Sequence, residues 1–222
     1  MDSRPGQEND DINFIRSRVT LWREQGHPRV TPVTRTLLEY WTRPERERRL
    51  FFCQIEALET LIFLTEAAPK LSDASILNKL AEALAAAGTP LPRQACKMAT
   101  GSGKTVVMVM IIAWQALNKR RYLTDRRFSD AFLAIAPGIT IRDRLRVILP
   151  SDPNNDYQAL DLVPVESLAD LGTGKIVIHN FHAFKPRDWG EAGRFTKRFS
   201  PGVSRPHSLS RRHRWSAGFA AS

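Results

Sequence analysis

The residues best suited to chemistry lie together between Met98 and Thr105. They read Met-Ala-Thr-Gly-Ser-Gly-Lys-Thr, and an apolar run from Val106 to Trp114 follows them. Glycines allow a backbone to turn its N–H groups toward an anion, and a helix N-terminus adds positive partial charge at the same point. A loop that ends in Gly-Lys-Thr at the start of a helix is typical of proteins that bind nucleotide phosphates. The stretch therefore predicts a phosphate-binding loop.

The polar residues of this loop have expected roles. We expect the ammonium group of Lys104 to reach the β- and γ-phosphates of ATP, and the hydroxyl of Thr105 to hold Mg²⁺. The loop residues expected to bind the nucleotide are Thr100, Gly101, Ser102, Gly103, Lys104 and Thr105. The strict pattern opens with a glycine, where this chain has Met98. The alternative is an ordinary glycine-rich turn that ends in Lys-Thr by chance.

Extended and helical patterns alternate around the loop. A short strand from Arg93 to Met98 is expected before it, and Cys96 within that strand is expected to be a buried packing residue rather than a nucleophile. The elements expected after the loop are a helix to about Arg120, a strand over 130–136, a short helix over 140–149, a loop over 150–156, a short helix over 164–171 and a strand over 175–179. Strands that alternate with helices predict an α/β fold with a parallel sheet.

The chain ahead of the loop has helical patterns. Apolar residues recur at helical spacing over 11–25, after Thr31-Pro32, over 50–67 and over 72–88, where Ser72 is expected to cap the last helix and Gly88 to end it. Residues 1–11 are polar and are expected to be disordered. The mixed charge run from Arg43 to Arg49 is interpreted as solvated surface in preference to a nucleic-acid contact.

Individual side chains in these segments have expected environments. Over 50–67, an apolar stripe should face the core with Glu56, Glu59 and Glu66 outside it. Trp22 and Trp114 are expected in the core.

Composition narrows the class of protein. The 222 residues carry a net charge of +10, which favours a polyanionic partner such as nucleic acid, with a basic surface that has no partner as the alternative. Residues 185–222 contain nine basic and two acidic residues, so this segment supplies +7 of that charge and weakens the argument. Cys53 and Cys96 match no disulfide framework or metal spacing. We expect a cytoplasmic protein with no signal peptide and no membrane span.

Four sequence blocks resemble the motifs of one family. Phe51–Ala57 is similar to its Gln motif, Met98–Thr105 to motif I, Ala136–Leu145 to motif Ia and Ile178–Phe184 to motif Ib. With these blocks in the expected order over about residues 37–187, the chain resembles the N-terminal part of the motor subunit of superfamily-2 DNA helicases, near the type III restriction enzyme Res-like branch.

The resemblance implies a fold and an organisation. It implies an α/β fold containing an incomplete RecA-like phosphate-loop NTPase domain with a parallel sheet over 50–187. A helical N-terminal extension over 1–49 would precede this domain, and a basic tail over 188–222, expected to be disordered, would follow it.

The resemblance also implies ligands and partners. ATP and Mg²⁺ are the implied cofactors, and the amide of Gln54 would read the adenine. The residues implied to contact DNA are Pro137, Gly138, Thr140, Arg142, Arg144, Asn180 and His182. The arginines among them are alternatively the solvated face of a helix. Double-stranded DNA and a modification or specificity subunit are the implied partners.

The chain lacks part of what such a motor needs. Its hydrolytic site requires an Asp-Glu pair, one carboxylate for Mg²⁺ and one for the attacking water. No Asp-Glu dipeptide occurs in the sequence, so no catalytic residue is assigned and little hydrolysis is expected. The chain is interpreted as a truncated motor, with its basic tail either a frameshifted end or a nucleic-acid-binding arm. The alternative function is a non-catalytic fragment that binds nucleic acid or a partner and has a vestigial phosphate loop.

Overall fold

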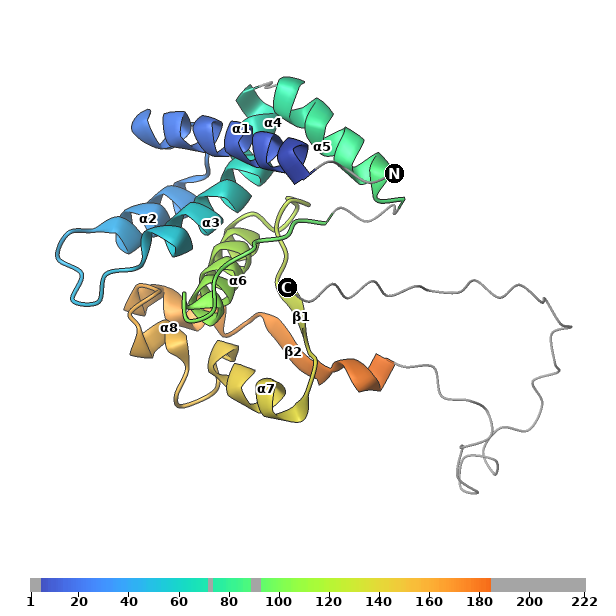
Figure 1. Cartoon of the computed structure of the whole chain (residues 1–222). Coiled ribbons are helices and arrows are strands. Elements are labelled where there is room, and N and C mark those ends of the chain that lie inside the picture. The colour runs from blue at the N-terminus through green and yellow to red at the C-terminus, as the bar shows by residue number, and fades with distance from the viewer. Residues whose placement is uncertain (1–4, 72–73, 89–92, 185–222) are drawn as a thin grey trace, which may run out of the picture. The chain divides into compact units, whose positions relative to one another are not determined.

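The computed structural model describes residues 5–71, 74–88 and 93–184, and the side chains from Asp10 onward (Figure 1). Contacts group the chain into a unit that ends at Ala183 and a second unit from Phe184. The helices before the phosphate loop are α1 (Pro5–Glu24), α2 (Pro32–Thr42), α3 (Phe52–Ile62), the π-helix η1 (Phe63–Ala67), α4 (Ala68–Leu71) and α5 (Ala74–Ala86). The later elements are α6 (Lys104–Arg121), β1 (Ala131–Ala136), α7 (Ile139–Arg144), η2 (Leu145–Ile148), α8 (Asp156–Ala159), η3 (Val165–Ser167), α9 (Leu168–Leu171), β2 (Lys175–Asn180) and η4 (Phe181–Phe184).

The two strands form a small parallel sheet. In its register, Ala131 lies opposite Lys175 and Ala136 lies opposite Asn180. Parallel strands need a crossover between them, and here α7, η2, α8, η3 and α9 provide it. This sheet and the surrounding helices confirm the α/β class at the level of mixed helix and parallel sheet.

The sheet packs on the core through one face only. Along each strand, more exposed side chains alternate with less exposed ones, because successive side chains of a pleated strand point to opposite faces of the sheet. Phe132, Ala134, Ile176 and Ile178 pack against the buried core. Leu133, Ile135 and Val177 on the opposite face are exposed. The described part of the chain therefore leaves this second face uncovered.

Helix α6 passes through the centre of the core. Its apolar residues are buried around the helix, which is the pattern of an element enclosed by others. It packs on α2, α3 and α9, and Val109, Met110 and Ala113 are fully buried. Trp114 and Trp22 are also buried, which confirms their expected place in the core.

The N-terminal helices end and begin at the expected signals. Thr31 caps α2, because its hydroxyl accepts a hydrogen bond from the Thr34 N–H at 3.1 Å, and Pro32 supplies the first helical residue. Gly88, with φ +59°, follows α5 and supports the predicted stop. The predicted Ser72 cap lies outside the described residues. Helix α1 begins at Pro5, so the expected disorder over residues 5–11 is wrong; a proline at a helix start favours this outcome.

The segment before the phosphate loop differs from its prediction. Residues 93–99 have no regular secondary structure, and Cys96 is exposed. The expected strand over 93–98 and its buried cysteine are therefore both wrong for the described structure. A strand forms only where a neighbour accepts and donates its backbone hydrogen bonds, and the described sheet consists of β1 and β2 alone.

The expected loop over 150–156 also needs a correction, because helix α8 begins at its last residue. Asn155 caps this helix by accepting a hydrogen bond from the Gln158 N–H at 3.1 Å. The short helices expected over 140–149 and 164–171 are present, each with a 3₁₀ part.

The charge run from Arg43 to Arg49 is only partly solvated. Arg46 is 5% exposed. Its guanidinium donates to the carbonyl oxygens of Arg48 at 2.8 Å, Asp161 at 2.8 Å and Leu160 at 2.5 Å. The interpretation of this run as solvated surface is thus wrong for Arg46, which instead fixes the end of α8 to the α2–α3 connection. An arginine can do so because its planar group directs several donors at once.

Among the described residues, no helix is both long enough and apolar enough to cross a membrane.

Candidate functional site

The phosphate loop is a tight turn held by two left-handed glycines. Gly101 has φ +79° and Gly103 has φ +77°, a region that residues with a Cβ rarely adopt. Gly103 directly precedes the 18-residue helix α6 and lacks a side chain that could cap it. The first N–H groups of such a helix have no acceptor within the helix. The local sequence thus produces a helix N-terminus able to receive an anion.

The loop closes on its own backbone. The Lys104 ammonium donates a hydrogen bond to the carbonyl oxygen of Ala99 at 2.8 Å, and the Ser102 hydroxyl donates to the same oxygen at 2.7 Å. Lys104 is exposed and Thr105 is partly exposed. A carbonyl oxygen is a weaker partner for an ammonium group than an anionic phosphate. Lys104 can therefore exchange this bond for one to a bound phosphate.

Gln54 connects helix α3 to the loop. Its Nε2 donates to the Ser102 carbonyl oxygen at 3.0 Å, and its Oε1 accepts a hydrogen bond from the Phe51 N–H at 2.8 Å. The second bond also satisfies a free N–H at the start of α3. Gln54 is only 4% exposed. The residue predicted to read adenine thus lies at the loop, with both ends of its amide engaged.

The contact between Gln54 and the loop requires a glycine. A Cβ added at Gly103 would lie 2.2 Å from Gln54 Nε2, which is far inside van der Waals contact. A Cβ added at Gly101 would meet nothing within 4 Å. Gly103 is therefore needed both for its backbone angle and for the space that Gln54 occupies.

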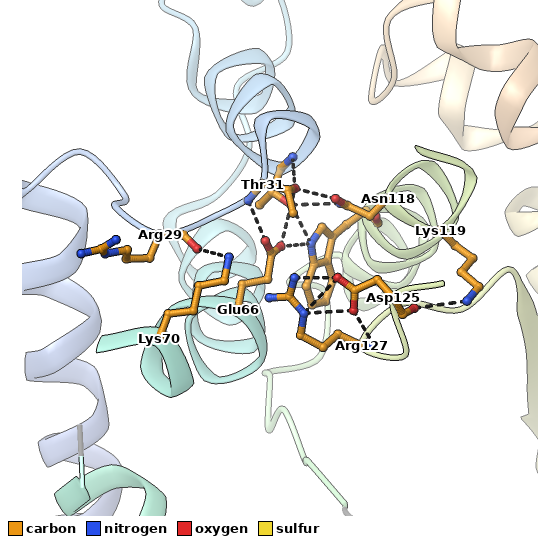
Figure 2. A network of polar contacts seen from close by, with 10 residues as sticks. Arg29, Thr31, Glu66, Lys70, Asn118, Lys119, Asp125 and Arg127 are labelled. Atoms are coloured by element: carbon orange, nitrogen blue, oxygen red, sulfur yellow. Dashed lines mark hydrogen bonds and ion pairs between the residues drawn. The ribbon is translucent and has the colours of Figure 1, made fainter. Parts of the chain in front are cut away.

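A buried polar network anchors the helix that begins at the loop (Figure 2). The Glu66 carboxylate accepts hydrogen bonds from the Thr34 hydroxyl at 2.6 Å, the Trp114 indole N–H at 2.8 Å and the Thr31 N–H at 2.8 Å. Asn118 joins the network by donating to the Thr34 hydroxyl at 2.9 Å. Glu66 lies in the π-helix η1, a deviation from α-helical geometry that is frequent at functional sites.

Glu59 and Glu66 are both fully buried, so their expected position outside the apolar stripe is wrong. Glu59 accepts hydrogen bonds from His27 at 2.8 Å and from the Arg23 Nε at 2.8 Å. Burial alone would raise the pKa of Glu59, but the hydrogen bonds from His27 and Arg23 outweigh it and lower this pKa. Glu56 remains partly exposed and pairs with Arg16.

Four of the seven residues implied to contact DNA lie at one end of the sheet. Pro137 and Gly138 follow β1, Asn180 ends β2 opposite Ala136, and the Asn180 side chain accepts a hydrogen bond from the His182 N–H at 3.0 Å. Helix α7 contacts both strands and carries the remaining three residues, Thr140, Arg142 and Arg144. Arg142 pairs with Asp143 at 2.8 Å, and Thr140 and Arg144 are exposed. The structure thus places Pro137, Gly138, Asn180 and His182 at the strand ends, and it places Thr140, Arg142 and Arg144 on a helix that packs beside the two strands.

The carboxyl ends of β1 and β2 and the phosphate loop lie toward the same end of α6. The chain reverses after α6, where the Ser129 N–H donates to Gln115 Oε1 at 3.0 Å, and β1 then runs opposite to α6 (Figure 1). The carboxyl ends of the strands therefore lie toward the end of α6 that carries the loop, where open α/β sheets bind their ligands.

In the described part of the chain, no group of three or more His, Cys, Asp or Glu residues could hold a metal ion. The sequence predicts one protein ligand for Mg²⁺, the hydroxyl of Thr105, which is the second residue of α6. A single protein ligand would be compatible with Mg²⁺, which commonly keeps several waters and binds substrate phosphates.

Comparison with known proteins assigns no family to this chain. No protein-family model matches this chain, and no curated protein and no solved structure matches it either.

Proposed function

We propose that this chain binds ATP with Mg²⁺ at the loop from Ala99 to Thr105. One observation carries the proposal: two left-handed glycines present Lys104 and the free N-terminus of an 18-residue helix at one point. In the bound form, Lys104 leaves the Ala99 carbonyl oxygen and pairs with the β- and γ-phosphates. Thr105 contributes its hydroxyl to Mg²⁺, which neutralises the phosphate charge.

We further propose that the chain is the front part of a superfamily-2 helicase or restriction motor with a RecA-like fold. The four sequence blocks support this, as does the gathering of Pro137, Gly138, Asn180 and His182 at the strand ends. Backbone N–H groups, amides and arginines at such an edge suit the phosphates of a DNA strand. A cytoplasmic location and a modification or specificity subunit as partner belong to the same proposal.

Hydrolysis of ATP by this chain should be very slow. Without an Asp-Glu pair, no assigned carboxylate positions the attacking water or completes the Mg²⁺ site. Steady-state ATPase assays with and without DNA measure this directly. A turnover typical of helicases that disappears in Lys104→Ala would contradict this part of the proposal.

Equilibrium titration with a fluorescent ATP analogue tests the binding proposal. Wild-type protein should bind the analogue in the presence of Mg²⁺, and Lys104→Ala should bind much more weakly. The control is Lys119→Ala, which changes a lysine at the opposite end of α6. Equal binding by wild type and Lys104→Ala would favour the second candidate function, a nucleic-acid- or partner-binding fragment with a vestigial phosphate loop.

The DNA proposal has a separate test. Deletion of residues 191–222 removes much of the basic tail, whereas Arg144→Ala removes an exposed arginine of α7, the helix beside the strands. If α7 and the strand ends bind DNA, the substitution lowers affinity in the deleted protein as well. Loss of all affinity on deletion would assign DNA binding to the tail instead.

A further inference from the structure

A cavity lies at the end of α6 that is remote from the phosphate loop. It encloses about 450 Å³ between α2, the last turn of α6 and the segment that contains η3 and α9. Small-molecule sites commonly have volumes of about 300–1,000 Å³. Lys104 begins α6 and Arg120 lies in its last turn, so at a rise of about 1.5 Å per residue roughly 24 Å of helix separates the two residues. The cavity is therefore distinct from the candidate nucleotide site.

Three apolar side chains of the cavity belong to or border the core. Leu37 of α2 is 2% exposed and Leu117 of α6 is 7% exposed, and both are members of the buried core cluster. Pro164, which precedes η3, is buried as well. The body of a ligand that covers these side chains is itself removed from water, which favours binding of an apolar group.

Polar groups from each of the three walls line the same cavity. They are the Thr36 hydroxyl of α2, the Arg121 guanidinium of α6 and the Ser167 hydroxyl of η3. None of the three has a hydrogen bond or an ion pair with another residue of the described part of the chain. Lys119 in the same turn of α6 differs, because it donates to two backbone carbonyl oxygens. The cavity thus combines apolar side chains with donors that have no protein acceptor.

The charges that line the cavity favour an anion with a single charge. Arg120 pairs with Asp170 at 3.4 Å. Two arginines and one aspartate leave a net charge of +1 among the lining residues. A carboxylate suits this set, because it accepts hydrogen bonds from hydroxyls and two at once from a guanidinium. A polyphosphate would place several negative charges beside Asp170, which is unfavourable.

We propose that this cavity binds a small monocarboxylate with an apolar body. Its carboxylate pairs with Arg121 and accepts hydrogen bonds from the lining hydroxyls, and its body covers Leu37 and Leu117. Such a ligand contacts α2, α6 and η3 together. The site is independent of the proposed ATP binding.

Fluorescence anisotropy of naphthoate, titrated with the whole chain, tests the proposal. We expect naphthoate to bind about tenfold more tightly than the neutral naphthylmethanol, as for one charge-assisted hydrogen-bonded pair. Acetate, which has the carboxylate but no apolar body, should not displace naphthoate at a tenfold excess. Saturating MgATP should leave naphthoate binding unchanged, because the two sites lie at opposite ends of α6.

Substitutions separate the roles of the lining residues. Arg121→Ala should weaken naphthoate binding by about tenfold, and the double substitution Thr36→Val and Ser167→Ala by about threefold. Asp170→Asn should strengthen it by about threefold, because a negative charge leaves the cavity and Arg120 is released. Arg126→Ala is the matched control, since Arg126 is an exposed arginine nearby in the sequence that does not line the cavity. Thermal unfolding of each variant establishes that it is folded.

Four results would overturn the inference. They are no binding of millimolar naphthoate by folded wild-type protein, equal affinity for naphthoate and naphthylmethanol, equal effects of Arg121→Ala and Arg126→Ala, and displacement of naphthoate by MgATP. The last result, together with loss of binding in Lys104→Ala, would place the carboxylate at the phosphate loop instead. Failure of the proposed function looks different, because a chain that ignores MgATP would still bind naphthoate in this cavity.

Discussion

At the scale of single residues, Gly103 has two separable roles. Any side chain there meets an unfavourable φ of +77°, and a Cβ would also displace Gln54. Gly101 has nearly the same φ with open space around it. We expect Gly101→Ala to lower the free energy of unfolding by about 1–2 kcal/mol, the backbone term alone. Gly103→Ala should lower it by about 1 kcal/mol more, because the Gln54–Ser102 hydrogen bond is lost.

Urea unfolding of the two glycine variants measures this difference. Equal destabilisation would show that Gln54 does not hold the loop in solution. Gln54→Ala in the Gly103→Ala background provides a control, since the clash is then absent.

Arg46 is the second residue with a specific expectation. Its guanidinium satisfies three carbonyl oxygens inside the protein, at Arg48, Leu160 and Asp161. Arg46→Ala leaves those oxygens without their donor, and we expect it to lower the free energy of unfolding by about 3 kcal/mol. Arg48→Ala should change it by less than about 0.5 kcal/mol, as at an ordinary surface position. Similar effects of both substitutions in urea unfolding would contradict the buried role of Arg46.

At the scale of elements, helix α6 is held to α3 and η1 at two points. Gln54 binds the loop at the start of α6, and Glu66 binds Trp114 further along it. Because α3 and η1 are consecutive, one continuous stretch of helix fixes both the phosphate loop and the helix behind it. Such support from packed neighbours is what keeps a binding loop in place.

The Glu66 network gives a testable coupling between these elements. Glu66→Gln keeps the shape but replaces one acceptor oxygen with a donor, so at least one of its three partners loses its acceptor. We expect a loss of about 2 kcal/mol in the free energy of unfolding. Glu56→Gln, which breaks a partly exposed pair, should lose less than about 1 kcal/mol.

A double-mutant cycle between Glu66→Gln and Trp114→Phe isolates the bond between η1 and α6. A coupling of at least about 0.5 kcal/mol in urea unfolding is expected for groups in one hydrogen-bond network. Strict additivity would mean that the two elements are not joined through this bond.

At the scale of the whole molecule, some of its carboxyl groups make stability sensitive to acid. Hydrogen bonds from Arg127 lower the pKa of Asp125 from 3.8 to about 2, and the pKa values of Glu59 and Asp161 are also lowered. A lowered pKa means that the unfolded state binds the proton more readily, so these groups stabilise the fold above the unfolded pKa. That contribution is lost as the pH falls from about 4 to about 2. Burial raises the pKa of Asp156, which acts in the opposite direction.

We therefore expect the urea concentration at the midpoint of unfolding to decrease as the pH is lowered from 5 to 2.5. Asp125→Asn should reduce this fall, because the group that titrates is gone, whereas the exposed Asp130→Asn serves as the matched control. A midpoint independent of pH in this range would contradict the account.

The sequence predicts the local features of this molecule better than the long-range ones. Thr31-Pro32 identifies the start of α2, and Gly-Lys-Thr identifies the start of α6, because each signal acts on its own backbone. The roles of Gln54, Glu66 and Arg46 depend on partners up to 115 residues away. A glutamate or arginine between charged neighbours has the same pattern whether it is solvated or buried. Their burial therefore emerges only from the structure.

The wrong prediction of a strand over 93–98 has the same cause, because a strand also depends on a partner that is distant in the sequence. An extended segment becomes a strand only when a neighbour pairs with it, and no local pattern states whether that neighbour is present.

The most direct test of the central claim is thermal unfolding of the whole chain with and without MgATP. A ligand that binds only the folded state stabilises it by ~2.7 kcal/mol at a free concentration 100 times its Kd. For a protein of this size, the account predicts that millimolar MgATP raises Tm by roughly 5–10 °C and that Lys104→Ala removes the rise. An unchanged Tm of the folded wild-type chain in millimolar MgATP would contradict it.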